Sequence, residues 1–315
     1  MQPADHRALC QPPIAETLCM TAPSPKISIV TPSFNQSVFL DDTIRSVLDQ
    51  NYPNLEYVVI DGGSSDGSVD IIRRHEARLS SWVSEKDAGQ YEAINKGFAR
   101  TSGDIMGWIN SDDKYLPWTF SIAGEIFAEH PEIEWITSLF PLHWDKGGRA
   151  VTCAARDGFS RAAFFRGENL AGGPWHSRGW IQQESTFWRR SLWERAGGKI
   201  DVTYRLAGDF ELWARFYQQA ELYGVSTPLG GFRAHGDQRS AQQFAAYTKE
   251  AEEVLRRYGG RPYRRFESFL LVKLLRYLAA PIRRLAARSQ LFYPRLVCLH
   301  RGPSGGWRVR KTKFR

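Results

Sequence analysis

Two adjacent aspartates, Asp112 and Asp113, close the segment GWINSDD at residues 107–113. The residues that lead into them, 104–109, are largely apolar and predict a buried strand. Adjacent carboxylates repel each other, and a bound cation would offset that repulsion. With no Cys or His beside them, these oxygen ligands favour a hard divalent ion such as Mg²⁺ or Mn²⁺. The motif NSDD also fits a solvated turn and helix cap ahead of Pro117.

Two other polar clusters also follow apolar runs, TPSFN at residues 31–35 and DGGSSDG at residues 61–67. Strands are expected at residues 26–30, 55–60 and 104–109, and helices at residues 38–48 and 68–79. Strands that alternate with helices at this spacing predict a parallel sheet with crossover helices. In such sheets ligands bind outside the carboxyl ends of the strands, where all three polar clusters fall.

The glycine-rich cluster after the second strand lacks the lysine of a P-loop and does not match G-x-G-x-x-G. Its glycines let the backbone approach a ligand closely. Asp61, at the end of the strand, is suited to accept a hydrogen bond from a base or a ribose. The alternative is a helix N-cap signal supplied by Ser64, Ser65 or Asp66.

Four longer segments occur in the order ISIVTPSFNQ, YVVIDGGSSDGS, SEKDAGQYEAINKGFARTSGDIMGWINSDD and AGDFELWARF. Together they resemble the family 2 glycosyltransferases, which are inverting enzymes of the GT-A fold, over about residues 26–240. The resemblance implies an α/β fold with a Rossmann-like, mostly parallel sheet flanked by helices. It also implies metal-dependent transfer from a nucleotide-sugar, with a UDP-sugar favoured, to a hydroxyl of a glycan or lipid-linked acceptor. Such a transfer would serve cell-surface polysaccharide biosynthesis.

The resemblance assigns donor binding to Thr31, Pro32, Phe34, Asn35, Asp61, Asp87, Lys96, Asn110 and Asp112. Within this set, Asp87 would bind sugar hydroxyls and Lys96 would bind the diphosphate or support the structure around it. Lys96 also fits a solvated helix position. Because Asn110 replaces the first Asp of the family's D-x-D element, the expected ligands of Mn²⁺ or Mg²⁺ are Asp112 and Asp113. His235 is a further expected ligand, although a lone histidine is often structural.

An inverting transfer needs a general base that removes the proton of the acceptor hydroxyl. The resemblance places this base on Asp209 of AGDFELWARF, with Glu211 as the fallback. Asp209 also fits a simple helix cap. The segment expected to face the acceptor contains Trp175, His176, Trp180, Gln182, Gln183 and Glu184. Aromatic faces suit sugar rings because they cover apolar C–H surface.

Composition sets the outer limits of the prediction. The chain has 315 residues and is 42% hydrophobic, as expected for a globular protein with a sizeable core. We expect residues 1–25 to be a disordered tail, residues 26–258 to be the GT-A domain and residues 259–315 to be a basic extension. Neither a transmembrane run nor a signal peptide is expected. Four scattered cysteines favour a reduced, cytoplasmic setting.

The net charge of +8 is unevenly distributed. Residues 256–315 contain 17 Lys and Arg and one acid, Glu267, which leaves 25 basic and 33 acidic residues before them. A basic tail on an acidic body argues against a nucleic-acid reader and favours an anionic surface met by the tail alone.

Residues 265–288 predict an amphipathic helix that Pro281 kinks. Its basic face holds Arg265, Lys273, Arg276, Arg283, Arg284 and Arg288, opposite Leu271, Leu274, Leu275, Leu278, Ile282 and Leu285. This pattern is typical of a helix at an anionic membrane surface, here the cytoplasmic face. The alternative is that the leucines pack on the catalytic domain.

Two other functions remain open from the residues alone. A sugar nucleotidyltransferase would want a basic, glycine-rich phosphate loop after the first strand, and TPSFNQS contains neither Gly nor Lys. A catalytically inactive glycan-binding module would be signalled by loss of Asp112, Asp113 or Asp209, and all three are present.

Overall fold

The computed structural model describes residues 24–170, 179–236, 238, 242–262, 296–303 and 305–312. Within them, a central sheet has the strand order β13-β12-β10-β6-β9-β4-β1-β2-β3, and a smaller sheet has the order β5-β11-β7-β8. The central strands are β1 (Ile27–Ser33), β2 (Leu55–Asp61), β3 (Ser81–Ser84), β4 (Ile105–Trp108), β6 (Trp135–Ser138), β9 (Phe187–Arg189), β10 (Leu222–Val225), β12 (Leu296–Arg301) and β13 (Trp307–Thr312). The smaller sheet contains β5 (Lys114–Tyr115), β7 (Leu142–Trp144), β8 (Ala150–Cys153) and β11 (Gly230–Arg233).

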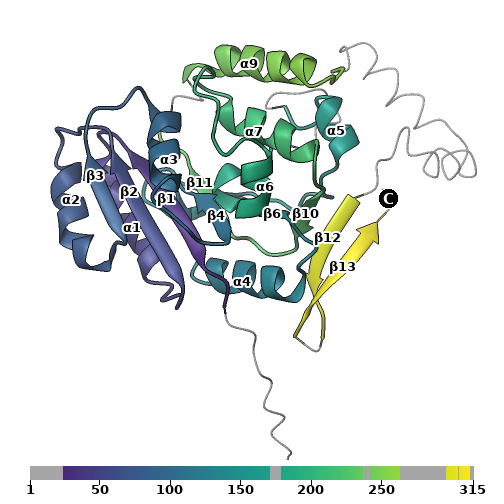
Figure 1. Ribbon diagram of the computed structural model, residues 1–315, viewed down its shortest axis with the longest axis horizontal. Helices are drawn as coiled ribbons and strands as arrows, with labels where there is room; N and C mark the ends of the chain where they lie inside the picture. Colours follow the sequence, from purple (N-terminus) through teal and green to yellow (C-terminus); the bar gives the residue numbers. More distant parts are fainter. Residues whose placement is uncertain are drawn as a thin grey trace, which may run out of the picture.

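The helices pack around these sheets (Figure 1). They are α1 (Ser37–Leu48), α2 (Ser68–His75), α3 (Gln90–Phe98), α4 (Thr119–Glu129), α5 (Arg161–Phe165), α6 (Arg190–Arg195), α7 (Gly208–Tyr217) and α9 (Phe244–Arg257). Two short 3₁₀ helices are η1 (Glu76–Arg78) and η2 (Gln183–Ser185).

The first half of the chain confirms the predicted parallel arrangement. Strand β1 pairs in parallel with β2 on one side and with β4 on the other. Ser33 lies opposite Asp61 in that register, so the ends of β1 and β2 meet at one edge of the sheet. The sheet is only mostly parallel, because β9 runs antiparallel between β4 and β6.

Alternating side chains of the strands build a core on each face of the central sheet. Ile29 packs in one buried cluster with α1 and α4, whereas its neighbour Val30 packs in the other with α3 and α7. In the second cluster the ring of Trp213 stacks between those of Trp108 and Trp135, at centroid distances of 5.9 and 5.6 Å. This contact fixes α7 against the sheet.

The C-terminal strands correct the predicted domain boundary at residue 258. Strand β12 pairs in parallel with β10 and forms an antiparallel hairpin with β13, which brings residues 296–312 into the central sheet (Figure 1). Leu296, Leu299 and Trp307 are buried there. These apolar side chains belong to a segment whose sequence is strongly basic, and they pack in the core of the central sheet.

Two predicted segments lie largely or wholly outside the described residues. The predicted N-terminal tail of residues 1–25 is described only for Ser24 and Pro25, and the predicted amphipathic helix of residues 265–288 is not described. Among the residues that are described, no helix combines the length and the apolar character needed to cross a membrane.

Candidate active site

A cavity of about 870 Å³ opens at the carboxyl ends of β1 and β4. Its floor comes from Pro32, Ser33 and Phe34 after β1 and from Asn110, Ser111 and Asp112 after β4. Its walls come from the start of α3, from η2, from the loop before α7, from the end of β11 and from α9. The cavity therefore gathers segments spread over more than 200 residues of sequence, from Pro32 to Tyr247.

Asp112 and His235 form a pair on the cavity wall. The Nε2 atom of His235 lies 2.9 Å from Oδ2 of Asp112. The imidazole packs against the ring of Phe39 at a centroid distance of 4.6 Å, which fixes its orientation. A carboxylate and an imidazole at hydrogen-bond distance are two groups that a divalent cation can share.

Asp209 occupies the first turn of α7 and also lines the cavity. None of the described residues forms a hydrogen bond with its Oδ1 atom, which is shielded from solvent. Burial raises the pKa of this carboxyl to about 6, and the charge of Glu250 adds to the effect. A carboxylate with a free oxygen and a pKa close to neutral suits a general base.

Part of the chain matches a known protein family in sequence. The family model described as glycosyl transferase family 2 matches residues 28–137. Residues 28–137 belong to this family. Bacillus subtilis TuaG, provisionally named for teichuronic acid biosynthesis, is 36% identical over 99 residues, 30% of this chain and 39% of TuaG. An uncharacterized glycosyltransferase of Mycobacterium tuberculosis is 40% identical over 93 residues, 29% of this chain and 36% of that protein.

The described part of the chain has the GT-A fold of solved enzymes. Staphylococcus aureus TarS in complex with UDP-GlcNAc superposes with a TM-score of 0.55, over 74% of this chain and 65% of that one, at 17% identity. Glucosyl-3-phosphoglycerate synthase of M. tuberculosis, in complex with Mn²⁺, UDP and phosphoglyceric acid, superposes with a TM-score of 0.51, over 76% of this chain and 80% of that one, at 20% identity.

Asp113, a predicted metal ligand, does not line the cavity. It is 1% exposed. Its Oδ1 accepts a hydrogen bond from the backbone N–H of Arg233 at 2.8 Å, and its Oδ2 accepts one from Asn110 at 3.3 Å. Burial, together with Asp112 and Glu184, raises its pKa well above the ordinary range. Asp113 therefore holds β11 against the NSDD loop, whereas Asp112 faces the cavity.

Four predicted donor residues besides Asp112 line the cavity: Pro32, Phe34, Asp87 and Asn110. The Asn110 side chain is fixed because Gln90 donates a hydrogen bond to its Oδ1 at 2.6 Å. Burial raises the pKa of Asp87. Phe34 is 59% exposed, which leaves an aromatic face for a planar base.

The remaining predicted donor residues lie outside the cavity lining. Thr31 is fully buried, with its hydroxyl 2.9 Å from that of Tyr57. The side chain of Asn35 accepts a hydrogen bond from the N–H of Ser65 at 2.9 Å. The side chain of Lys96 pairs with Glu85 and Glu92, each at 3.1 Å.

Asp61 is the fourth of these residues and is also fully buried. Its carboxylate accepts hydrogen bonds from the N–H groups of Gly63 and Ser64 and from the hydroxyls of Ser64 and Ser84. The turn after β2 is thus built around Asp61, and the predicted direct contact with a base is not supported by its position.

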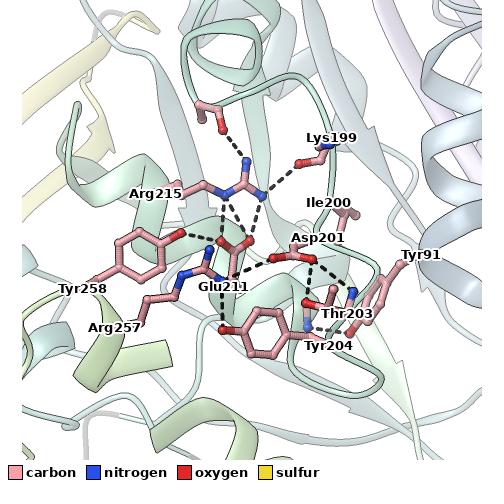
Figure 2. Close-up of polar contacts among 12 residues, drawn as sticks. Tyr91, Lys199, Ile200, Asp201, Thr203, Tyr204, Glu211, Arg215, Arg257 and Tyr258 are labelled. Carbon is pink, nitrogen blue, oxygen red and sulfur yellow. Dashed lines mark hydrogen bonds and ion pairs between the residues drawn. The ribbon is translucent and has the colours of Figure 1, made fainter. Parts of the chain in front are cut away.

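Glu211, the fallback base, is structural. Figure 2 shows its carboxylate between the guanidinium of Arg215 and the hydroxyl of Tyr258, at 2.7 and 2.6 Å. Arg215 in turn donates to the backbone carbonyl of Lys199 at 2.8 Å. The carboxylate is therefore fully engaged in hydrogen bonds to Arg215 and Tyr258, and Glu211 does not line the cavity.

Only part of the segment expected to face the acceptor lines the cavity. Trp180, Gln183 and Glu184 line the cavity. Gln182 instead bonds the backbone of Leu142, at 3.1 and 3.2 Å. Trp175 and His176 lie outside the described residues.

Sequence reasoning missed further lining residues, notably Arg205, Gln238 and Tyr247. Tyr247 follows an amphipathic helical pattern, which by itself indicates only packing. Arg205 precedes the general-base candidate by four residues, and that proximity is the one signal the sequence offered.

Proposed function

We propose that this protein transfers a sugar, with inversion, from a nucleotide-sugar donor to a hydroxyl of an acceptor. One observation carries the proposal: a single cavity is lined by the Asp112–His235 pair and, separately, by Asp209, whose Oδ1 has no hydrogen-bond partner among the described residues. The first group suits the leaving diphosphate and the second suits the attacking hydroxyl. The family match covers only residues 28–137, so the reaction of the whole chain is inferred from the cavity.

The reaction that this cavity supports is a single displacement. The acceptor hydroxyl gives its proton to the carboxylate of Asp209 as its oxygen bonds to the anomeric carbon. The bond from that carbon to the diphosphate breaks on the opposite face, and the electron pair leaves with the nucleoside diphosphate. Attack opposite the leaving group inverts the anomeric configuration.

A divalent cation, Mn²⁺ or Mg²⁺, fits the same cavity. The described residues contain no group of three or more His, Cys, Asp or Glu side chains able to hold a metal ion. Such ions are commonly bound by one or two carboxylates together with substrate phosphates. Asp112 and His235 could therefore supply the protein ligands, and the donor diphosphate the others. When bound, the ion would neutralise charge that develops on the leaving diphosphate.

A donor screen tests the proposed function. Purified protein is incubated with Mn²⁺ and a panel of UDP-, GDP- and dTDP-sugars, and the released nucleoside diphosphate is measured. We expect release from at least one donor, a UDP-sugar above the others, and loss of release when EDTA is in excess. Full release in excess EDTA would contradict metal dependence, and no release from any donor would contradict the function itself.

The acceptor is proposed to be a glycan or lipid-linked intermediate of cell-surface polysaccharide biosynthesis at the cytoplasmic face of the membrane. The relative named for teichuronic acid biosynthesis supports this class of acceptor. The amphipathic pattern of residues 265–288 supports attachment to anionic lipid, to which each basic residue contributes about 1 kcal/mol.

Vesicle sedimentation tests the attachment. We expect the protein to sediment with vesicles that contain anionic lipid at low salt and to be released at high salt. Replacing Arg276, Arg283, Arg284 and Arg288 by Gln should abolish sedimentation while donor turnover remains. Unchanged sedimentation of this variant would overturn the attachment and leave the transfer reaction unaffected.

A further inference from the structure

Glu184 is a second buried carboxyl on the cavity wall that the proposed reaction does not use. It lies in η2, is 4% exposed and lines the cavity. No described residue forms a hydrogen bond with its Oε1 atom. A buried polar atom without a partner is costly, so such atoms in folded proteins commonly have a use.

The backbone around Glu184 is held firmly. The side chain of Gln183 donates a hydrogen bond to the carbonyl of Trp108, at the end of β4. The hydroxyl of Ser185 exchanges hydrogen bonds with the backbone of Gly230, each at 3.1 Å. A Cβ atom at position 230 would lie 2.3 Å from the carbonyl oxygen of Glu184, so only glycine permits this approach. The backbone that carries this carboxyl is therefore fixed by neighbours on both sides, at a position that lines the cavity.

The groups whose charges affect Glu184 are acidic. The charges of Asp112 and Asp209 raise the pKa of its carboxyl, and the charge of Glu184 in turn raises the pKa values of Asp113 and of the Tyr115 phenol. The guanidinium of Arg233, on the adjoining β11, pairs with Asp42. Burial, with these like charges, raises the pKa of Glu184 to about 8.

We propose that Glu184 binds the sugar being transferred and enters that contact as a neutral carboxylic acid, donating a hydrogen bond to a sugar hydroxyl oxygen. This inference rests on the proposed function. In an inverting transfer the sugar lies between the leaving diphosphate and the attacking hydroxyl. Asp112, Asp209 and Glu184 line the same cavity, and the part of the donor that must lie between the first two is the sugar.

Glu184 would stay neutral when a divalent cation and a sugar nucleotide are bound. A divalent cation near Asp112 would on its own favour the ionised form of Glu184. The two negative charges of a bound sugar nucleotide would offset those of the cation, which would leave the effect of the Asp112 and Asp209 carboxylates on Glu184. A neutral acid in this position gives a donor without adding a fourth negative charge to the cavity wall beside Asp87, Asp112 and Asp209.

The protonation state is tested without substrate, by infrared difference spectroscopy of the whole protein at pH 7. We expect the spectrum of the unmodified protein minus that of Glu184→Gln to contain a carboxylic acid carbonyl band. Glu168→Gln removes another glutamate that is 4% exposed, one that pairs with Arg166 at 2.9 Å outside the cavity, and provides the matched control. A carboxylate band in place of the acid band for Glu184 would overturn the proposal.

The substrate contact is tested by kinetics with the sugar nucleotide that the donor screen turns over fastest. Glu184→Ala should lower kcat/KM by roughly tenfold to a hundredfold, the usual effect of removing a hydrogen bond that involves a buried polar group. Glu184→Gln can still donate, so its loss should stay below about tenfold. The unmodified protein should lose activity as pH rises through about 8, because an ionised Glu184 cannot donate. This alkaline loss should be absent in Glu184→Gln and present in Glu168→Gln.

Two kinetic outcomes would overturn the proposal. If Glu184→Gln is as impaired as Glu184→Ala, the site needs a negative charge, as a metal ligand or a base would. If Glu184→Ala retains full kcat/KM, the side chain does not touch the sugar. Absence of turnover by the unmodified protein would instead contradict the proposed function, and the infrared result for Glu184 would be unaffected by it.

Discussion

At the scale of single residues, Asp209 is decisive because its protonation limits the reaction. A base must be ionised to accept a proton, so turnover should fall as pH drops through about 6, the pKa that burial gives Asp209. Asp209→Asn should lower turnover by roughly 10²- to 10⁴-fold and leave donor binding nearly unchanged. Steady-state kinetics and calorimetry with the donor check both parts. Near-normal turnover of Asp209→Asn would assign the base elsewhere.

The neighbouring aspartates should differ sharply in what they do. Asp112→Asn should weaken Mn²⁺-dependent binding of nucleoside diphosphate and leave the unfolding midpoint nearly unchanged, because this side chain faces the cavity. Asp113→Ala should lower the free energy of unfolding by about 1–3 kcal/mol, since it leaves the N–H of Arg233 buried without a partner. Calorimetry and denaturant unfolding separate the two effects. Equal loss of Mn²⁺ dependence in both variants would restore Asp113 as a ligand.

At the scale of elements, α9 positions the base through the loop that precedes α7. Glu250 of α9 accepts hydrogen bonds from the N–H groups of Leu206 and Ala207, both at 2.9 Å. On the other side of the loop, the hydroxyl of Tyr91 donates to the carbonyl of Leu206 at 2.7 Å and accepts from Gly208 at 3.0 Å. The loop is thus held from two helices that are far apart in the sequence.

Glu250→Gln should therefore lower kcat by about tenfold with little change in the donor KM, because it replaces a charged acceptor by a weaker one that must reorient. Steady-state kinetics on the best donor measure both constants. The control is Glu253→Gln, an exposed position on the same helix. An equal fall of kcat in the control would show that the effect arises from the helix in general and not from the loop.

At the scale of the whole molecule, the hairpin β12–β13 belongs to the folding unit. The backbone N–H of Trp307 donates to Glu129 of α4 at 2.7 Å, and its indole N–H donates to Glu125 at 3.1 Å. Trp307→Ala should lower the free energy of unfolding by about 3–5 kcal/mol, the usual cost of removing a buried aromatic ring. Denaturant unfolding measures this cost.

A chain that ends at residue 262 should lose still more stability, since it exposes the edge of β10. A chain that starts at Met20 is the matched control. It keeps the hydrogen bonds that Tyr52 and Asn54 donate to the carbonyls of Pro25 and Ser24. Normal stability of the chain ending at residue 262 would restore the predicted boundary at residue 258.

The sequence by itself determined the parallel half of the sheet and the polar ends of its strands. Local periodicity and turn residues act over a few positions, which is why β1, β2 and α1 were predicted within one to three residues at each end. The resemblance of four ordered segments to the family 2 glycosyltransferases singled out Asp112 and Asp209.

Only the tertiary structure decided which of the polar side chains face the cavity. Asp112 and Asp113 are adjacent in sequence, yet one faces the cavity and the other is buried beneath β11, because neighbouring side chains after a strand point in different directions. The roles of Glu184 and Glu250 depend on contacts between segments more than 40 residues apart, as does the return of β12 to the sheet. No local pattern encodes such contacts, since they follow from how separate elements pack.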